Sequence, residues 1–272
     1  MSTDIPKKLW EGRIPACFEL ATYENCSSQN PSPFFTMLSN NSYLTLFSEK
    51  LTDYFSEFVD TSKVDEIWFE FEGTPLHWHY PCGLLFDLHC KLDKNLPWTI
   101  TVHFQNFPEK QLLRCPCEEA IQANFMSVLK EADHLKHKGS VVNSMSRNQH
   151  SQLWYGIKTD NFNEFWTINR KFMDGFEGTS FFRNIPLCVY HNGRVFQKLI
   201  VAKPSEGVDN ILTLKDALQV IDKTIFSDDS LDNMRVVVQG TTPLLSSPIQ
   251  WLSENMSYAD NFLHVCVFDT MR

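Results

Sequence analysis

The chain repeats one order of strand and helix patterns, with a purely helical stretch between the two copies. In the first copy, alternation of apolar residues predicts strands, and the turn at Gly73-Thr74-Pro75 separates two of them. The predicted strands span 9–20 (broken at Pro15), 42–47, 67–71, 76–80 and 98–104. A helical spacing over 51–59 follows the second strand, and a short apolar segment over 83–88 precedes the last. This order is that of a β-grasp domain, the ubiquitin fold.

The second copy lies at the C-terminal end of the chain. Strands are predicted over 185–190 and 195–202, joined by a turn at His191-Asn192-Gly193, and Asn-Gly is the strongest local hairpin signal. A helix over 214–221 with Thr213 as its cap comes next. A strand over 234–239, a short helix starting at Pro248 and a strand over 262–268 complete a second β-grasp order.

The middle of the chain has a helical period instead. Apolar residues on one face predict a helix over 118–138, ended by Gly139-Ser140; they are Ile121, Phe125, Val128, Ala132 and Leu135. Shorter helices are predicted over 152–157 and 163–173. The sequence therefore predicts an α+β chain with two ubiquitin-like β-grasp domains that flank a helix-rich domain. The predicted division is 1–105 (with a loop insert near 21–41), 106–183 and 184–272.

Charge and hydropathy exclude several classes of protein. The net charge of the 272 residues is −9, and no basic stripe is present that would bind nucleic acid. No apolar run reaches the roughly 18 residues that span a bilayer, so any membrane contact is expected to be peripheral. The first residues have no apolar core and do not look like a signal peptide. The eight cysteines follow no disulfide spacing, so we expect reduced thiols and a cytoplasmic location.

No sequence motif for catalysis or cofactor binding is present. G-x-S-x-G, Gly-rich phosphate loops and H-E-x-x-H are all missing, so no catalytic residue and no cofactor are expected. One cluster has zinc-ligand chemistry, with two histidines that would share a strand face; it consists of His77, His79, Cys82, His89 and Cys90. Its spacing matches no common zinc framework, so we predict ordinary strand and turn residues and no metal.

A pair of cysteines, Cys115-Pro116-Cys117, stands just before the long predicted helix. A position beside a helix start can lower a thiol pKa and make the thiol reactive. The alternative interpretation of the chain is therefore a thiol transfer enzyme that uses Cys115 or Cys117. An isolated C-x-C closes neither a zinc site nor an ordinary redox motif, so we expect these thiols to be incidental.

One lysine on the long helix points to solvent. At about 100° per residue, Lys130 is nine positions and half a turn away from Ile121 on the apolar stripe. Lys136 falls near the edge of that stripe, and Lys138 is intermediate. A helix anchored by one packed face presents an amine reproducibly, although most exposed lysines are simple solvated charges.

Aromatic-rich runs that are long enough to be specific occur along nearly the whole chain. They are Gly12-Arg13-Ile14-Pro15, Ser42-Tyr43-Leu44-Thr45-Leu46, Glu66-Ile67-Trp68-Phe69-Glu70-Phe71-Glu72-Gly73-Thr74-Pro75-Leu76, Trp78-His79-Tyr80-Pro81, Pro97-Trp98, Thr101-Val102-His103-Phe104, Phe107-Pro108-Glu109-Lys110, Phe165-Trp166-Thr167-Ile168-Asn169-Arg170-Lys171 and Gln250-Trp251-Leu252-Ser253-Glu254. On these runs the chain resembles the autophagy protein 5 family. The segment from Phe125 to Asp133 is similar to that family's acceptor helix. His77, Cys82, Cys90 and Cys117 lie outside the family pattern.

The resemblance implies a non-catalytic scaffold. It implies that Lys130 receives the C-terminal glycine of the ubiquitin-like autophagy protein 12 through an isopeptide bond, with the E2-like autophagy protein 10 acting in conjugation. It further implies that the conjugate binds the coiled-coil autophagy protein 16. That complex would act like an E3 ligase on the E2-like autophagy protein 3, promoting transfer of an Atg8-type modifier to phosphatidylethanolamine. It would be recruited peripherally to pre-autophagosomal membranes. The resemblance assigns no residues to the groove for autophagy protein 16.

The C-terminal end supports an acceptor role independently. The chain ends Phe268-Asp269-Thr270-Met271-Arg272, and a transferable modifier needs a terminal glycine. We therefore expect a substrate or scaffold and not the modifier itself. A second alternative is a β-grasp adaptor that binds partners without becoming conjugated.

Overall fold

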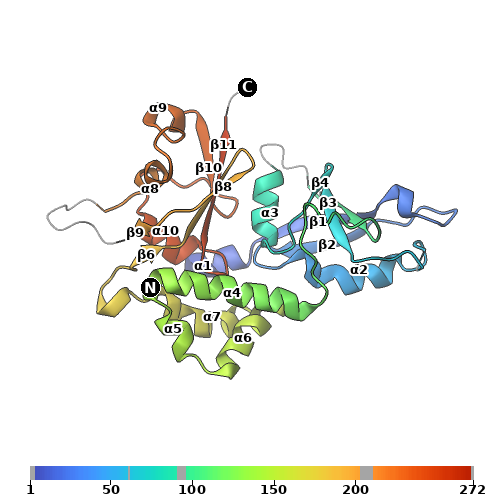
Figure 1. Cartoon of the computed structure of the whole chain (residues 1–272), viewed down its shortest axis with the longest axis horizontal. Helices are drawn as coiled ribbons and strands as arrows, with labels where there is room; N and C mark the ends of the chain where they lie inside the picture. Colours follow the sequence, from blue (N-terminus) through green and yellow to red (C-terminus); the bar gives the residue numbers. More distant parts are fainter. Residues whose placement is uncertain (1–3, 61, 91–95, 203–210, 271–272) are drawn as a thin grey trace. The chain divides into compact units, whose positions relative to one another are not determined.

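The computed structural model describes residues 4–60, 62–90, 96–202 and 211–270 (Figure 1). The chain forms two compact units. One, here called the N-terminal unit, is Trp10–Asn124. The other, the C-terminal unit, is Phe125–Arg272 together with Met1–Leu9. The prediction that the chain does not begin with a signal peptide concerns, in part, residues 1–3, which lie outside the described residues.

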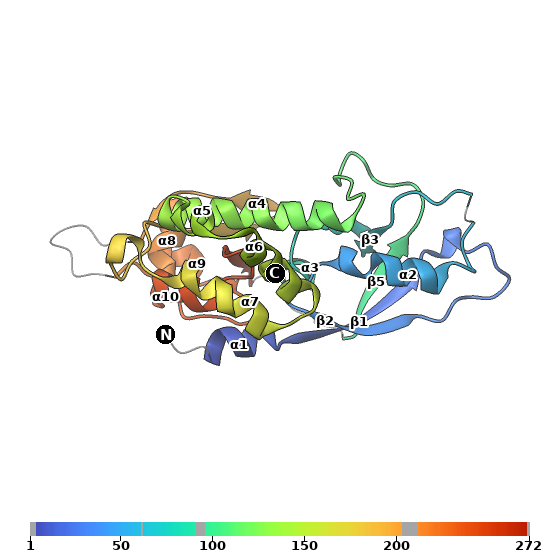
Figure 2. The ribbon, with the colours of Figure 1, turned by 90° about the horizontal axis from the view of Figure 1, so that it is seen from below.

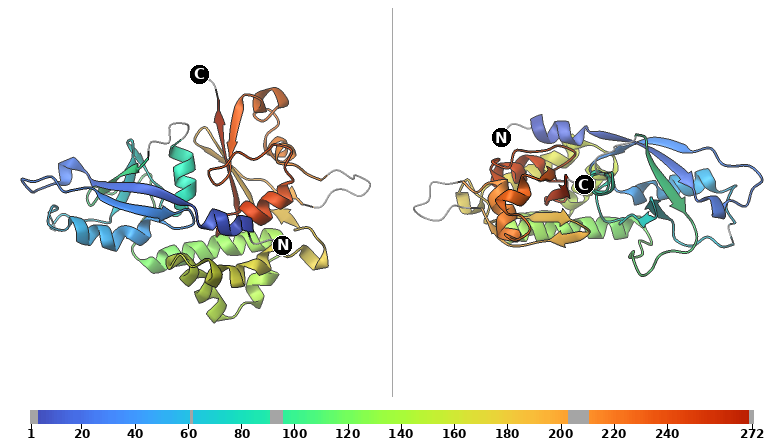
Figure 3. Two further views of the ribbon diagram at one scale, coloured as in Figure 1. Left: turned by 180° about the vertical axis from the view of Figure 1, so that it is seen from behind. Right: turned by 90° about the horizontal axis from the view of Figure 1, so that it is seen from above.

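The N-terminal unit is built on a five-stranded sheet in the order β2-β1-β5-β3-β4. β1 (Arg13–Leu20) pairs antiparallel with β2 (Phe34–Ser39) and parallel with β5 (Trp98–His103). Figure 3 shows the β1–β2 hairpin from behind. The remaining elements are β3 (Trp68–Phe71), β4 (Thr74–Pro75), α2 (Ser48–Phe55), α3 (Cys82–His89) and the short 3-10 helices η1 (Thr22–Glu24) and η2 (Leu44–Phe47). Helix α1 (Asp4–Trp10) belongs to the C-terminal unit except for its last residue. A hairpin, a helix and a central parallel pair make this a β-grasp sheet.

One face of this sheet forms the core of the N-terminal unit. Ile14, Ala16 and Phe18 alternate toward it along β1, because side chains of a strand point to opposite faces in turn. Phe18 is fully buried, and its ring lies 5.9 Å from that of Phe69 on β3. Leu51 and Phe55 bring α2 onto the same core. The sheet and α2 therefore hold each other through one apolar layer.

The prediction for the second strand was wrong. Residues 42–47 contain η2 and no strand, and the partner of β1 lies within the predicted loop insert, at Phe34–Ser39. Tyr43 and Leu44 are both buried, and two consecutive buried side chains do not fit a strand with one solvated face. On β2 the apolar residue Phe35 is 64% exposed. Apolar side chains therefore lie on both faces of this strand, and the sequence shows no alternation of buried apolar and exposed polar residues there.

Two further strand predictions need correction. The chain leaves β4 in a turn, so residues 76–80 form no strand. The strand predicted over 9–20 starts too early, because residues 9 and 10 belong to α1. The predicted break at Pro15 is also absent, since β1 runs through this residue. Pairing with β5 starts only at Ala16, so the missing N–H of Pro15 removes no hydrogen bond on that side.

Helices fill the first half of the C-terminal unit (Figure 2). They are α4 (Glu118–His137), whose first residues belong to the N-terminal unit, α5 (Ser140–Ser144), α6 (Arg147–Lys158), α7 (Phe162–Asn169), η3 (Arg170–Met173) and η4 (Phe176–Gly178). Gly139 ends α4 with φ +83°, a conformation that favours glycine. Ser146 and Gln149 form a reciprocal capping box that starts α6.

Gly156 is required where α6 packs against α7. A Cβ atom at this position would lie 2.7 Å from the backbone nitrogen of Phe165, which cannot move without moving α7. We expect Gly156→Val to lower the free energy of unfolding by about 1–3 kcal/mol, as overpacking of a tight contact does. Urea denaturation measures this. Tyr155→Val, on the exposed side of the same helix, is the matched control, and an equal loss there would show that the close helix contact is not the cause.

The second half of the C-terminal unit repeats the β-grasp order. Its four-stranded sheet has the order β10-β11-β7-β8, with β7 and β11 parallel at the centre. Its elements are β6 (Asn184–Ile185), β7 (Leu187–His191), β8 (Arg194–Phe196), β9 (Ile200–Val201), α8 (Leu214–Ile221), α9 (Asp228–Leu231), β10 (Met234–Val237), α10 (Ile249–Met256) and β11 (Leu263–Asp269). Asn192 and Gly193 both have positive φ, which confirms the predicted hairpin turn. The α+β class with two ubiquitin-like domains around a helical region is confirmed.

The helical region and the second sheet share one apolar core. Met173 from η3 and Phe182 from the following segment pack in the same cluster as Val189 and Val265 of the sheet. Leu218 of α8 and Leu252 of α10 complete its centre. This shared core explains why the C-terminal unit is one compact body.

Candidate functional site

Helix α4 carries the candidate acceptor lysine, and its buried face fixes that lysine's direction. Ile121, Phe125, Leu129 and Ala132 are the apolar residues buried along it. Phe125 contacts Trp154 of α6, with ring centroids 5.9 Å apart. The predicted stripe contained Val128 and Leu135, which are only half-buried, in place of Leu129. The stripe is thus rotated slightly from its predicted position.

Lys130 is exposed on the opposite side of α4, as its angle on the helix predicts. The neighbouring Glu131 accepts a hydrogen bond from Gln197 Nε2 at 3.2 Å. Within the described part of the chain, Lys130 has no ion-pair partner. Its amine is therefore held on a rigid element and left open to solvent.

Lys136, six residues further along, is completely buried. Its ammonium donates to Asn261 Oδ1 at 3.1 Å and lies 4.5 Å from the centre of the Phe182 ring. Burial lowers the pKa of Lys136 to about 7, and the carboxylates of Glu254, Asp133 and Asp260 oppose that shift. The place of Lys136 near the edge of the apolar stripe was the sequence signal for this burial. An outside electrophile cannot reach Lys136.

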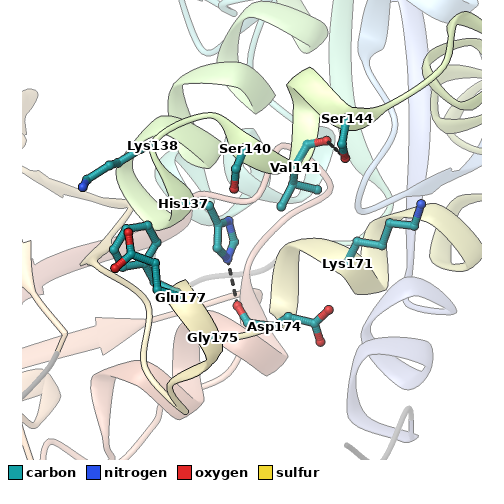
Figure 4. Close-up of a pocket in the computed structure, with 10 residues that line it drawn as sticks. His137, Lys138, Ser140, Val141, Ser144, Lys171, Asp174, Gly175 and Glu177 are labelled. Carbon is teal, nitrogen blue, oxygen red and sulfur yellow. Dashed lines mark hydrogen bonds between the residues drawn. The ribbon is translucent and has the colours of Figure 1, made fainter.

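A cavity of about 540 Å³ lies in the helical region, beyond the end of α4. Figure 4 shows His137 pointing into it, with Ser140 nearby. Lys138 and Lys171 also line it, but their amines point away from each other and from His137. The Lys138 amine lies 5.1 Å from the centre of the Phe176 ring. The two lysines therefore form no common anion site.

His137 cannot act as a base toward Ser140. Its Nε2 lies 2.8 Å from the backbone oxygen of Asp174, and its Nδ1 lies 3.0 Å from Asp133 Oδ1. A backbone carbonyl can only accept, so Nε2 donates to it and has no lone pair for a serine hydroxyl. Asp133 Oδ2 also accepts from the amide of Val142. These contacts hold the end of α4 and do not form a nucleophile–base pair.

The five residues with zinc-ligand chemistry, for which the sequence predicted no metal, are spread over different elements. His77 and His79 lie in the turn after β4, with ring centroids 5.3 Å apart, and not on a strand face as predicted. Cys82 begins α3, His89 ends it, and Cys90 follows it. Burial lowers the pKa of His79 to about 4 and raises the pKa of the Cys82 thiol. Within residues 4–60, 62–90, 96–202 and 211–270, no three His, Cys, Asp or Glu side chains are arranged to hold a metal ion.

Cys115 lies in an environment that opposes reactivity. Burial, together with the nearby carboxylate of Glu66, raises the pKa of its thiol to about 12. This raised pKa speaks against the alternative of a reactive thiol at Cys115. The Cys115 amide donates to Glu66 Oε1, which fixes the segment, and Cys117 is exposed. A half-buried thiol beside a carboxylate is a poor nucleophile at neutral pH.

Three family models match the chain in succession. They are described as "Autophagy protein ATG5, UblA domain" over residues 9–104, "Autophagy protein ATG5, alpha-helical bundle region" over 118–175 and "Autophagy protein ATG5, UblB domain" over 184–267. Together they cover both sheets and the helical region between them.

Curated relatives and a solved structure agree with these matches. Autophagy protein 5 of Drosophila melanogaster is 36% identical over 97% of this chain and 96% of its own length. Autophagy-related protein 5 of Caenorhabditis elegans is 33% identical over 97% of this chain and 98% of its own. The crystal structure of Kluyveromyces marxianus Atg5 superposes with a TM-score of 0.81, covering 98% of this chain and all of that one; at 19% identity it supports the fold alone. None of the described helices is both long and apolar enough to cross a membrane. The chain belongs to the autophagy protein 5 family.

Proposed function

We propose that this chain is the acceptor subunit of a conjugate in autophagosome formation. Lys130 is joined by an isopeptide bond to the C-terminal glycine of the ubiquitin-like autophagy protein 12, with the E2-like autophagy protein 10 as donor. The conjugate binds autophagy protein 16 and acts like an E3 ligase. It promotes transfer of an Atg8-type modifier from the E2-like autophagy protein 3 to phosphatidylethanolamine on membranes that it joins peripherally from the cytoplasm. One observation carries this: on the anchored helix of a family member, Lys130 is exposed and has no ion-pair partner among the residues that the structure describes.

The chemistry of the bond favours Lys130 over its neighbours. Its Nζ attacks the thioester carbonyl carbon, the C–N bond forms, the C–S bond breaks, and the thiol leaves on the E2-like enzyme. The proton lost by the amine goes to the leaving thiolate or to solvent. Lys136 is 0% exposed and cannot approach a thioester. Lys138 follows the end of α4 and has its amine over the Phe176 ring.

In this proposal the chain positions the acceptor amine of Lys130, and the partner enzymes supply the catalytic groups. Both ring nitrogens of His137 already lie within hydrogen-bond distance of an oxygen, one of Asp133 and one of Asp174, so His137 is not available as a general base. The raised pKa of the Cys115 thiol makes Cys115 a poor nucleophile. We further propose a three-part functional division with edges near residues 105 and 184. The stretches between successive family-model matches, 105–117 and 176–183, support edges at these places.

Reconstitution tests this function and both alternatives. The chain is incubated with the E1-like enzyme, autophagy proteins 10 and 12 and ATP, and its intact mass is measured. We expect a product heavier by one copy of autophagy protein 12, mapped to Lys130. The Cys115→Ser/Cys117→Ser variant should give the same product and support the same rate of lipidation.

Two outcomes would contradict the proposal. Binding of the partners without any covalent product would favour the unconjugated adaptor. Loss of lipidation in the double Cys→Ser variant, with the conjugate still formed, would favour the thiol transfer enzyme.

A further inference from the structure

An isopeptide bond at Lys130 forms efficiently only if a proton acceptor lies close to the attacking amine. A neutral amine that adds to the thioester carbonyl carbon acquires a positive charge on its nitrogen, and that nitrogen must lose a proton before the amide is complete. A side chain that takes the proton as the C–N bond forms accelerates such a step by about 10²–10⁴-fold. The residues within one helical turn of Lys130 decide whether this chain can supply such a group.

One available base lies beside Lys130 on α4. Residues three and four positions apart are neighbours on a helix surface, whereas residues one and two apart do not face each other. The four neighbours of Lys130 at these spacings are Met126, Ser127, Asp133 and His134. Asp133 is fully buried, and its two oxygens lie 3.0 Å from His137 Nδ1 and 2.8 Å from the amide of Val142. Methionine and serine do not take up a proton at neutral pH. His134 is therefore the base that remains.

The imidazole of His134 is open to solvent. His134 is exposed on α4, and within the part of the chain that the structure describes its ring makes no hydrogen bond and no ion pair. Side chains of a helix lean toward its N-terminus, so the ring of His134 leans over the turn that carries Lys130. A neutral imidazole has a lone pair on one ring nitrogen. An exposed amine and an unoccupied base thus share one face of an anchored helix.

The charged groups around His134 come from α4 and the residue that follows it. Lys130 lies four positions before His134, Glu131 three before it and Lys138 four after it. The carboxylate of Glu131 accepts a hydrogen bond from Gln197, a neutral side chain between β8 and β9. Among residues 4–60, 62–90, 96–202 and 211–270, no charged side chain of another element forms an ion pair with the ring. His134 lies in the last turn of α4, where the helix dipole favours a cation.

We propose that His134 is the general base for the amine of Lys130. The neutral amine attacks the thioester carbonyl carbon and the C–N bond forms, while a ring nitrogen of His134 takes one proton from the amine nitrogen. The C–S bond then breaks, and the sulfur leaves with the electron pair as a thiolate. The imidazolium returns its proton to that thiolate or to solvent. This step rests on the proposed function and adds one group of this chain to the catalytic groups of the partner enzymes.

Single-turnover conjugation measures this step. The intact chain and its His134→Gln variant are each mixed with the preformed thioester of autophagy protein 12 on autophagy protein 10. Glutamine suits an exposed helix position and takes up no proton, so an equal Tm of the two proteins is expected. At about pH 8 the maximum rate constant should fall about tenfold or more, with the half-saturating chain concentration unchanged, because a base acts only in the transition state.

The pH dependence gives a readout that a structural role would not move. An imidazole gains and loses its proton between about pH 5 and 8, and once protonated it can no longer act as a base. The ratio of the two rate constants, unchanged chain over His134→Gln, should therefore approach one toward pH 5.5 and level off above about pH 7.5. Effects of pH on the partner enzymes cancel in this ratio. A ratio that is the same at every pH, or that grows as the pH falls, would overturn the role of His134.

Lys138→Gln is the matched control. It removes a positive charge within one turn of His134 and keeps the imidazole, so its rate constants should equal those of the unchanged chain at every pH. A loss as large as that of His134→Gln would show that a nearby cation, and not a base, assists the reaction. If the unchanged chain gives no product at Lys130 at all, the proposed function itself is wrong. Product at Lys130 with a rate that does not depend on His134 contradicts only the role of this histidine.

Discussion

Lys130→Arg should abolish the covalent product with autophagy protein 12 and leave the fold unchanged. Arginine keeps the positive charge and has nearly the helix propensity of lysine, and the position is exposed. A guanidinium ordinarily loses its proton about two to three pH units above an ammonium. The neutral nucleophile is therefore scarcer by about a hundredfold or more. Intact-mass measurement after reconstitution should show unmodified chain, and lipidation should fall with the conjugate.

The control for this result is Lys138→Arg, a lysine on the same segment that is also exposed. It should conjugate like the unchanged chain. Binding to autophagy protein 16 should persist in both variants, because it uses another surface. Continued formation of the isopeptide-linked product in Lys130→Arg, or its formation through Lys136 or Lys138, would show that Lys130 is not the acceptor.

Lys136→Met should flatten the dependence of stability on pH. Burial lowers the pKa of Lys136 to about 7 in the folded chain, whereas an unfolded lysine titrates near 10.4. Between these values the unfolded state holds a proton that the folded state has lost, so stability rises with pH. The slope is at most about 1.4 kcal/mol per pH unit for one proton. The unchanged chain should thus gain about 2 kcal/mol relative to Lys136→Met between pH 7.5 and 9.5.

Urea denaturation of both proteins across this pH range measures the effect. Buried thiols act in the opposite direction; burial raises the pKa of Cys188 to about 12, for example. These contributions are the same in both proteins and cancel in the difference. Lys136→Met leaves Asn261 Oδ1 without its donor, which shifts the stability at every pH but does not change the slope. Parallel curves for the two proteins would show that Lys136 does not titrate in this window.

The sequence predicts best where local pattern and tertiary packing agree. Asn192-Gly193 predicts its hairpin correctly, since both residues adopt the positive φ that the turn needs. The capped helix at Thr213 is also as predicted, because Thr213 and Asp216 form a reciprocal cap within one turn. In the N-terminal unit, Phe35 is exposed on β2, and Tyr43 and Leu44 are buried in a 3-10 turn. There, tertiary packing overrides the local preference, and the strand prediction fails.

The candidate site shows the same limit. Helical angle alone places Lys130 in solvent correctly, since it depends only on the period of α4. The burial of Lys136 depends on Phe182 and Asn261, which are 46 and 125 positions away in the chain. Likewise, burial and then Glu66, which comes from another part of the chain, raise the pKa of the Cys115 thiol, and the local sequence beside the helix start shows neither. Contacts between distant segments carry no signal in a single sequence.

The core shared by the helical region and the second sheet separates two meanings of the word domain. The family models end one module at 175 and begin the next at 184. Yet Lys136 of α4 bonds to Asn261, Asn261 Nδ2 donates to Asn169 of α7, and the amide of Arg183 donates to the backbone oxygen of Lys136. A ubiquitin-like module cut out at its sequence boundary would expose the apolar side chains that Met173 and Phe182 cover. In this chain the segment matched by a family model and the unit that packs around one core have different boundaries, and the second is larger.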